Sequence, residues 1–87
     1  MYEIKYLKSF YKNYKKINKN DKKSIESINH KIREICNNPY LTPYKKLVGY
    51  DNYLRYRIGK YRLIIEIKNN LIIIRNIKQR KDVYKKL

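Results

Sequence analysis

Cysteine and histidine each occur only once in this chain of 87 residues, as Cys36 and His30. A single cysteine excludes an intramolecular disulfide and leaves no cysteine-based metal site. His30 lies off the apolar stripe of its predicted helix, so we expect an exposed side chain and not the base of a catalytic triad. Cys36 falls on that stripe and is expected to be a small core residue. We therefore expect neither a metal ion nor any other cofactor.

Glycine occurs only twice, and long apolar runs are absent from the sequence. No glycine-rich loop of the kind that binds nucleotide phosphates is present. No stretch approaches the roughly 18 apolar residues of a membrane span, and residues 1–16 contain no apolar segment of signal-peptide length. We expect a cytoplasmic protein that does not associate with membranes.

Acidic residues are scarce, since seven Asp and Glu stand against 23 Lys and Arg, for a net charge of +16. Self-repulsion of this size costs stability, so the charge predicts an anionic partner. Arginine is more informative than lysine because only six arginines occur in a lysine-rich chain. Five of them lie close together in the second half of the sequence: Arg55, Arg57, Arg62, Arg75 and Arg80.

A strand and two helices are predicted in the first half of the chain. Residues 2–7 alternate apolar and polar side chains, which indicates a strand, and residues 8–17 place apolar side chains at helical spacing. Asp21 is a favourable N-cap for a second helix. The sequence Asn37-Asn38-Pro39 ends that helix, so the two helices form a hairpin.

Three further strands are predicted at residues 52–58, 60–67 and 71–77, with turns at Gly59-Lys60 and Asn69-Asn70. The order β-α-α-β-β-β predicts one α+β domain that spans residues 1–87. In this domain the helical hairpin packs on one face of a small, mainly antiparallel four-stranded sheet. A short segment follows at the C-terminus.

The Gly59-Lys60 hairpin would place Arg57 directly opposite Arg62, although opposed like charges destabilise a sheet. The rigid fork of arginine matches phosphate oxygens, so a phosphate between these two side chains would replace repulsion by shared attraction. Strand alternation puts both arginines on the face that the helices leave open. The residues predicted on this open face are Tyr53, Arg55, Arg57, Arg62, Ile64, Glu66, Ile73 and Arg75. The helices are expected to cover Leu54, Tyr56, Ile58, Leu63, Ile65, Ile67, Ile72 and Ile74.

Catalysis in this chain would have to use arginine, lysine and tyrosine. That set suits RNA, which carries its own nucleophile in the 2′-hydroxyl group. A protein can cleave RNA by aligning this oxygen with the phosphate and stabilising the added negative charge. A tyrosine or lysine crowded by cations has a lowered pKa and can serve as a base. Tyrosines among the basic residues would also offer rings on which bases stack.

The second half of the chain resembles the RelE/ParE superfamily of toxins. The resemblance runs through KLVG at 46–49, YLRYRIGKYR at 53–62, the isoleucine-rich last strand and RKDVY at 80–84. It implies a toxin of a toxin–antitoxin pair. The RelE branch is implied to be an endoribonuclease that cuts mRNA in the ribosomal A site, and an acidic antitoxin wraps and neutralises it.

The resemblance also implies roles for individual residues. Arg62 and Arg80 are expected to bind the scissile phosphate, and Arg55 or Arg57 to abstract a proton or stabilise charge. Tyr84 is expected to stack on a base or transfer a proton. The expected contacts to mRNA and rRNA are Lys46, Tyr53, Arg75, Lys78 and Lys81.

Two departures from the family pattern affect proton transfer. Many relatives have histidine before the late arginine, where this chain has Gln79. The basic pair Arg55 and Arg57 stands in place of lysines, and arginine makes a poor base because it stays protonated. Two other functions remain open: a ParE-like toxin that inhibits DNA gyrase without cleaving RNA, and a non-toxic basic module that binds nucleic acid.

Overall fold

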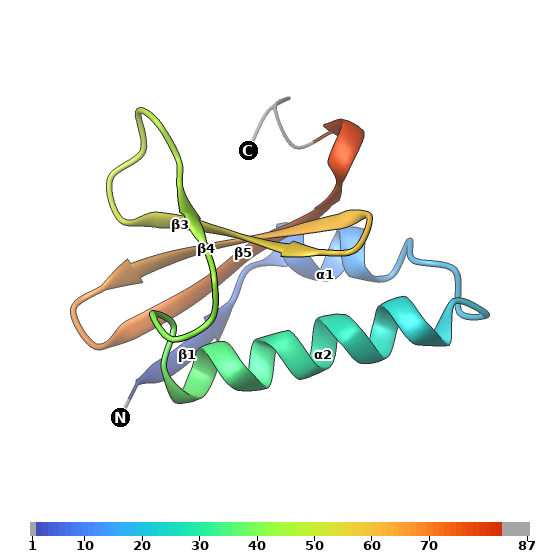
Figure 1. Ribbon diagram of the computed structural model, residues 1–87, viewed down its shortest axis with the longest axis horizontal. Coiled ribbons are helices and arrows are strands. Elements are labelled where there is room, and N and C mark those ends of the chain that lie inside the picture. The colour runs from blue at the N-terminus through green and yellow to red at the C-terminus, as the bar shows by residue number, and fades with distance from the viewer. Residues whose placement is uncertain (1, 83–87) are drawn as a thin grey trace.

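The computed structural model describes residues 2–82, and the predicted Tyr84 therefore lies outside the described residues. One sheet runs through the molecule, with two helices on one of its sides (Figure 1). The elements in chain order are β1 (Glu3–Tyr6), α1 (Lys8–Tyr14), α2 (Lys22–Asn37), β2 (Lys45–Lys46), β3 (Tyr53–Ile58), β4 (Tyr61–Lys68), β5 (Leu71–Gln79) and the 3₁₀ turn η1 (Arg80–Asp82).

The strand order in the sheet is β1-β5-β4-β3-β2, so the first strand lies beside the last. β1 pairs with β5 in parallel, and all other pairs are antiparallel. The predicted α+β class and helical hairpin are confirmed. The predicted count of four strands is wrong by one, because Lys45 and Lys46 form an additional edge strand against β3. Two residues are too few to show a strand periodicity in the sequence.

The predicted start of the second helix is confirmed in detail. The Asp21 side chain accepts a hydrogen bond from the Ser24 backbone N–H at 3.2 Å and so caps α2. The first helix is shorter than predicted, since α1 ends at Tyr14. A turn follows in which the Ile17 N–H donates to the Tyr14 carbonyl at 3.2 Å, and this turn still carries Ile17 into the core.

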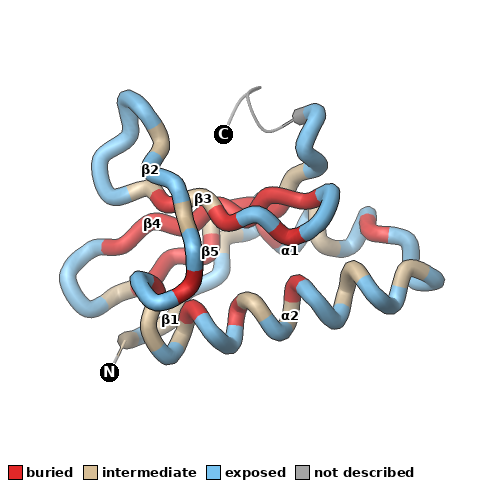
Figure 2. The backbone as a smooth tube through the Cα atoms, in the orientation of Figure 1, coloured by how far each residue is buried: buried red, intermediate tan, exposed pale blue. Residues whose placement is uncertain are grey.

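The hairpin register predicted from Gly59-Lys60 is confirmed, because Arg57 pairs with Arg62 and Ile58 with Tyr61. Gly59 has a φ of +56°, a left-handed conformation that glycine adopts without steric cost. Burial alternates along β3, whereas β4 is buried from Tyr61 to Ile67 and is coloured accordingly in Figure 2. The side chains of the predicted core face pack with those of the helices in one core cluster. Its fully buried side chains include Tyr56, Leu63, Ile65, Ile72 and Ile74.

An irregularity in the pairing of β4 with β5 determines where Arg75 points. Ile64 pairs with Asn76 and Ile65 with Ile74, so Arg75 is the extra residue of a β-bulge. Its side chain reaches Glu66, which lies on the open face beside Tyr53. Arg75 therefore lies on the open face, as predicted.

The connection from α2 to β2 is fixed by side chains from distant parts of the chain. The hydroxyl of the buried Tyr56 donates to the Pro39 carbonyl at 2.6 Å, and the Lys31 ammonium donates to the Thr42 hydroxyl at 2.8 Å. This segment passes the edge of the sheet. The loop between β2 and β3 lies on the side of the sheet opposite the helices, and so does η1 (Figure 1). The loop and η1 thus flank the open face.

Candidate nucleic-acid interface

Four of the five predicted catalytic residues line one cavity with a volume of about 470 Å³ on the open face. They come from three separate segments, namely β3, β4 and η1. We call this the arginine cavity, and its lining residues are Pro43, Tyr44, Lys45, Arg55, Arg57, Arg62 and Arg80.

Strand pairing explains why these side chains converge. Arg57 and Arg62 are direct partners across the β3–β4 ladder, and Lys45 of β2 lies opposite Arg55 of β3. Partners across a ladder project to the same face of the sheet. Arg80 joins them because its N–H donates to the Lys60 carbonyl at 2.7 Å, which holds the start of η1 against the hairpin turn.

Arg62 differs from its partner in burial. Its residue exposure is only 8%, whereas Arg57 is exposed. The Nη1 atom of Arg62 donates to the carbonyl oxygens of Gly59 at 2.7 Å and Tyr61 at 2.8 Å. A buried cation requires such partners, because desolvation of an uncompensated charge is costly. Arg62 thus supports the turn of its own hairpin as well as lining the arginine cavity.

The arginine cavity is strongly electropositive. Among the residues whose side chains the structure describes, seven line the cavity, and they include five cations and no acid. Cations around a concave surface reinforce one another's field, so the site favours an anion with several oxygens, such as a phosphodiester or a pentacoordinate phosphorus intermediate. The acid predicted nearest to this face is neutralised elsewhere: Glu66 pairs with Arg75 at 2.7 Å and Lys68 at 3.5 Å.

The residues predicted to contact RNA are spread around the arginine cavity and are not gathered into it. Tyr53 and Arg75 are in mutual contact on the open face, with the guanidinium carbon 4.8 Å from the ring centroid. Lys46 borders a hollow of about 520 Å³ at the loop between β2 and β3. Lys81 is exposed in η1, directly after Arg80.

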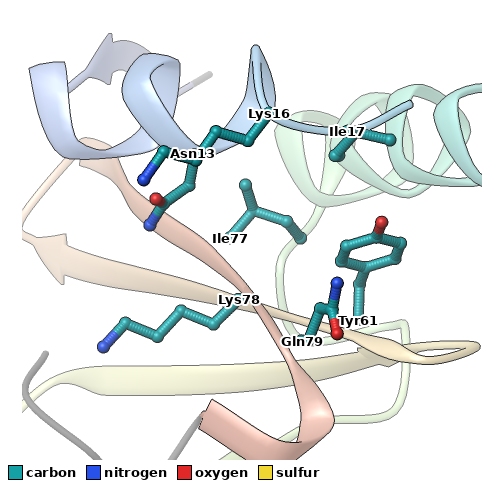
Figure 3. A pocket seen from close by; sticks show the side chains of 7 residues that line it. All are labelled: Asn13, Lys16, Ile17, Tyr61, Ile77, Lys78 and Gln79. Carbon is teal, nitrogen blue, oxygen red and sulfur yellow. The ribbon is translucent and has the colours of Figure 1, made fainter. Parts of the chain in front are cut away.

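Lys78 lies in a different cavity, with a volume of about 360 Å³, near the end of β5. Asn13 and Lys16 form one wall of it, and Ile77, Tyr61 and Gln79 lie across from them (Figure 3). Lys78 is not among the residues that line the arginine cavity, but it pairs directly with Arg62 across the β4–β5 ladder.

The structure adds three residues that the sequence did not indicate: Pro43, Tyr44 and Lys45. They belong to the connection between α2 and β3, whose course has no periodic signal in the sequence. Lys45 arrives at the cavity only through its pairing with Arg55. The one sequence feature that pointed to Lys45 is the basic pair Lys45-Lys46, which lies shortly before the strand that carries Arg55 and Arg57.

The other titratable candidates lie in ordinary structural positions. His30 is exposed and lies 3.7 Å from Glu34, and Cys36 packs against the core. Burial raises the pKa of the Cys36 thiol and of the Tyr56 hydroxyl, so both remain protonated at neutral pH. Among residues 2–82, no three His, Cys, Asp or Glu side chains are grouped so as to hold a metal ion. In the same part of the chain, no helix has the length and apolarity needed to cross a membrane.

Comparison with known proteins agrees with this architecture. Residues 4–84 match the family model described as the ParE toxin of the type II toxin–antitoxin system parDE. Toxin RelE3 of Methanocaldococcus jannaschii is 35% identical over an alignment of 86 residues, and the match covers 94% of this chain and 94% of the relative.

Solved structures with the same fold include the RelB–RelE antitoxin–toxin complex from Methanococcus jannaschii, at a TM-score of 0.69 and 31% identity, with 92% of this chain and 94% of that chain covered. The YoeB dimer of Staphylococcus aureus is similar at a TM-score of 0.72 and 28% identity, with 88% of this chain and 94% of that chain covered. The sequence match spans nearly the whole chain and the fold agrees with it, so this chain belongs to the RelE/ParE superfamily of toxins of type II toxin–antitoxin systems.

Proposed function

We propose that this toxin is a metal-independent endoribonuclease that cleaves mRNA in the ribosomal A site and so inhibits translation in the cytoplasm. The observation that carries the proposal is the convergence of Arg55, Arg57, Arg62 and Arg80 on one cavity. None of its described lining residues is acidic. An inhibitor that acts only by binding a protein has no need of four arginines that converge on one cavity.

The proposed reaction is attack of an RNA 2′-hydroxyl on the adjacent phosphate. The bond from O2′ to phosphorus forms while the bond from phosphorus to O5′ breaks, which leaves a 2′,3′-cyclic phosphate. Arg62 and Arg80 bind the non-bridging oxygens, whose negative charge grows in the transition state. Preorganised donors at such a position are worth roughly 10²–10³-fold in rate each.

Two proton transfers complete the reaction. The 2′-hydroxyl loses its proton, and the departing O5′ gains one. Arginine is a poor base, so Arg55 and Arg57 act chiefly by stabilising charge and by orienting the 2′-oxygen. We assign both proton transfers to Tyr84. Polar groups of the ribosomal RNA are the other proposed proton donors and acceptors.

The proposed regulator is an acidic antitoxin that wraps the toxin. One of the similar solved structures is a complex of an antitoxin with its toxin, RelB–RelE. A net charge of +16 makes this chain a strong electrostatic partner for an acidic protein. Coverage of the arginine cavity by such a partner would exclude RNA.

A second candidate function is inhibition of DNA gyrase. The observation that favours it is the family match itself, because the matching model describes ParE toxins. On this alternative the open face would bind gyrase and no RNA would be cut.

One experiment separates the two. The toxin is expressed under tight control in cells, and transcript 5′ ends are mapped across the transcriptome within minutes of induction. Cleavage sites in phase with codons and confined to translated regions support the ribonuclease. DNA damage with intact mRNA would refute it and support gyrase inhibition. The variant Arg80→Ala serves as the catalytic control, since its exposed side chain leaves the core undisturbed.

A further inference from the structure

Three side chains at the far end of the open face form a continuous stack, which we call the tyrosine stack: Tyr50, Tyr53 and Arg75. The ring centroids of Tyr50 and Tyr53 are 5.1 Å apart with an interplanar angle of 32°. The guanidinium of Arg75 lies 4.8 Å from the centroid of the Tyr53 ring. Tyr53 is half-buried between its neighbours, whereas Tyr50 retains 48% exposure.

The stack is held by contacts on both sides. Arg75 donates to the Glu66 carboxylate at 2.7 Å, and Glu66 is itself only 7% exposed. This buried carboxylate fixes the guanidinium against the Tyr53 ring.

The loop that carries Tyr50 is also closed by backbone hydrogen bonds. The Tyr50 N–H donates to the Leu47 carbonyl at 3.3 Å, and the Leu47 N–H donates to the Tyr53 carbonyl at the same distance. Gly49 has a φ of +83° and Asn52 a φ of +65°, which allow the chain to reverse direction twice. The orientation of Tyr50 is therefore set before any ligand binds.

The tyrosine stack and the arginine cavity share one face. Tyr53, Arg55 and Arg57 alternate along β3 and project to the same side of the sheet. Arg57 lies four residue steps along the strand from Tyr53, a distance of roughly 13 Å at about 3.3 Å per residue. A single strand of RNA with one phosphate in the arginine cavity passes over the stack within a few nucleotides.

We propose that Tyr50 is the platform of a nucleobase subsite, on which one unpaired base of the bound RNA stacks. This inference rests on the proposed ribonuclease function and adds to it a contact that positions the substrate. Bases of any kind stack on aromatic rings. Arg75 and Tyr53 supply a rigid support beneath the ring. The exposed neighbour Asp51 disfavours a phosphate at this point, so the contact is made to the base and not to the backbone.

The first test measures binding without cleavage. A fluorescently labelled RNA oligonucleotide with 2′-O-methyl groups cannot react, and its affinity is followed by fluorescence anisotropy. Tyr50→Ala should weaken binding roughly tenfold, because stacking on one aromatic ring is worth about 1–3 kcal/mol per base. Tyr50→Phe should bind like the wild type, since the ring and not the hydroxyl makes the contact. Tyr11→Ala is the matched control, because Tyr11 is also 48% exposed but lies on α1.

A second arm identifies the base. An abasic nucleotide is moved along the oligonucleotide one position at a time. An abasic nucleotide at one position should lower the affinity of the wild type roughly tenfold, as Tyr50→Ala does. At that position the affinity of Tyr50→Ala should not fall further. Additive losses at every position, equal affinities of the wild type and Tyr50→Ala, or no binding by either protein would each overturn the subsite.

Cleavage is scored separately on programmed ribosomes. Tyr50→Ala should raise KM roughly tenfold and leave kcat nearly unchanged, whereas a folding defect would reduce the active fraction and with it kcat. A wild type that binds the oligonucleotide through Tyr50 but cuts no mRNA would refute the nuclease while retaining the subsite. An unchanged KM in Tyr50→Ala with an active wild type would refute the subsite alone.

Discussion

Arg57 lies directly opposite Arg62 across the β3–β4 ladder, so two guanidinium groups share one face of the sheet at adjacent positions. Burial makes the pair asymmetric, because Arg62 is held by two backbone carbonyls of the hairpin whereas Arg57 is exposed. Like charges at such positions oppose folding. The pair is therefore a place where activity and stability make opposite demands on the same residues.

Replacing Arg57 with alanine should leave the free energy of unfolding unchanged or raise it by up to about 1 kcal/mol, because the opposed positive charge is gone. Cleavage of mRNA should fall by roughly 10²-fold or more, since one preorganised cation is lost from the arginine cavity. Urea unfolding followed by circular dichroism measures the first effect, and primer extension on translated mRNA measures the second. Arg33→Ala removes an arginine on α2, outside the cavity, and should retain full activity.

A clear loss of stability in Arg57→Ala would contradict this account, because it would mean that the side chain supports the fold and that its repulsion with Arg62 is negligible. Full cleavage activity in the same variant would remove Arg57 from the reaction altogether.

Arg62 and Arg80 should respond differently to the same substitution. Arg62→Ala removes hydrogen bonds to two carbonyls in a buried position, so the free energy of unfolding should fall by about 1–3 kcal/mol along with activity. Arg80→Ala removes an exposed side chain and should abolish activity with little effect on stability. Both are measured by urea unfolding and by cleavage of translated mRNA.

The conservative variant Arg62→Lys separates the two roles of that residue. It keeps the charge but loses the fork that reaches both carbonyls and a phosphate. We expect partial recovery of stability and little recovery of cleavage. Equal stability of Arg62→Ala and Arg80→Ala would show that the buried contacts of Arg62 do not matter for folding.

The sequence predicted the parts of this molecule that depend on local rules. The turn residues Gly59-Lys60 set the register of the hairpin, and alternation along β3 assigned each side chain to the correct face. The same rules placed Glu66 and Arg75 on one face, where the structure pairs them at 2.7 Å. These features depend on residues that are close in sequence or paired through a short turn.

Features that depend on contacts between distant segments were not predictable. The connection to β2 is positioned by Tyr56 and Lys31, each more than ten residues away from its partner in that segment. The burial of Arg62 was also not expected, since a charged residue on an open face is usually exposed. Its burial follows from hydrogen bonds to carbonyls whose direction depends on the folded turn.

The contact between Glu66 and Arg75 should be needed for the tyrosine stack. Glu66→Gln keeps the shape of the side chain but removes the charge that holds the guanidinium, and Glu66→Ala removes both. We expect the free energy of unfolding to fall by about 1–3 kcal/mol in Glu66→Ala and by less in Glu66→Gln, in line with loss of a charge-assisted hydrogen bond. Urea unfolding measures the stability of both variants. Glu26→Ala is the control, because it removes an acidic side chain that is exposed.

Affinity for RNA provides a second readout of the same variants. Without the carboxylate, Arg75 is no longer fixed under Tyr53, and the support of Tyr50 is weakened. Binding of the unreactive oligonucleotide should therefore decline in Glu66→Ala even though a negative charge has been removed from a basic protein. Tighter binding would show that charge alone governs affinity on this face.

The helix cap at Asp21 should make stability depend on pH in the acidic range. Its pKa is lowered, first by the side-chain hydrogen bond with Ser24, then by the Ser24 backbone N–H, with a smaller contribution from Lys60. A carboxylate with a lowered pKa in the folded state stabilises the protein fully above its unfolded value of 3.8, and this contribution is lost as the pH falls through the lower folded value. The urea midpoint of Asp21→Ala should thus lie below that of the wild type at pH 7. The difference should shrink as the pH falls below 3.8.

Asp21→Asn tests whether the effect is titration or capping. Asparagine is also a good N-cap residue but does not ionise in this range. This variant should be more stable than Asp21→Ala at every pH, and its midpoint relative to Asp21→Ala should not change across the acidic range. A difference between wild type and Asp21→Asn that stays constant from pH 7 to below 3.8 would mean that the charge of Asp21 contributes nothing and that its hydrogen bond to the α2 backbone is the whole effect.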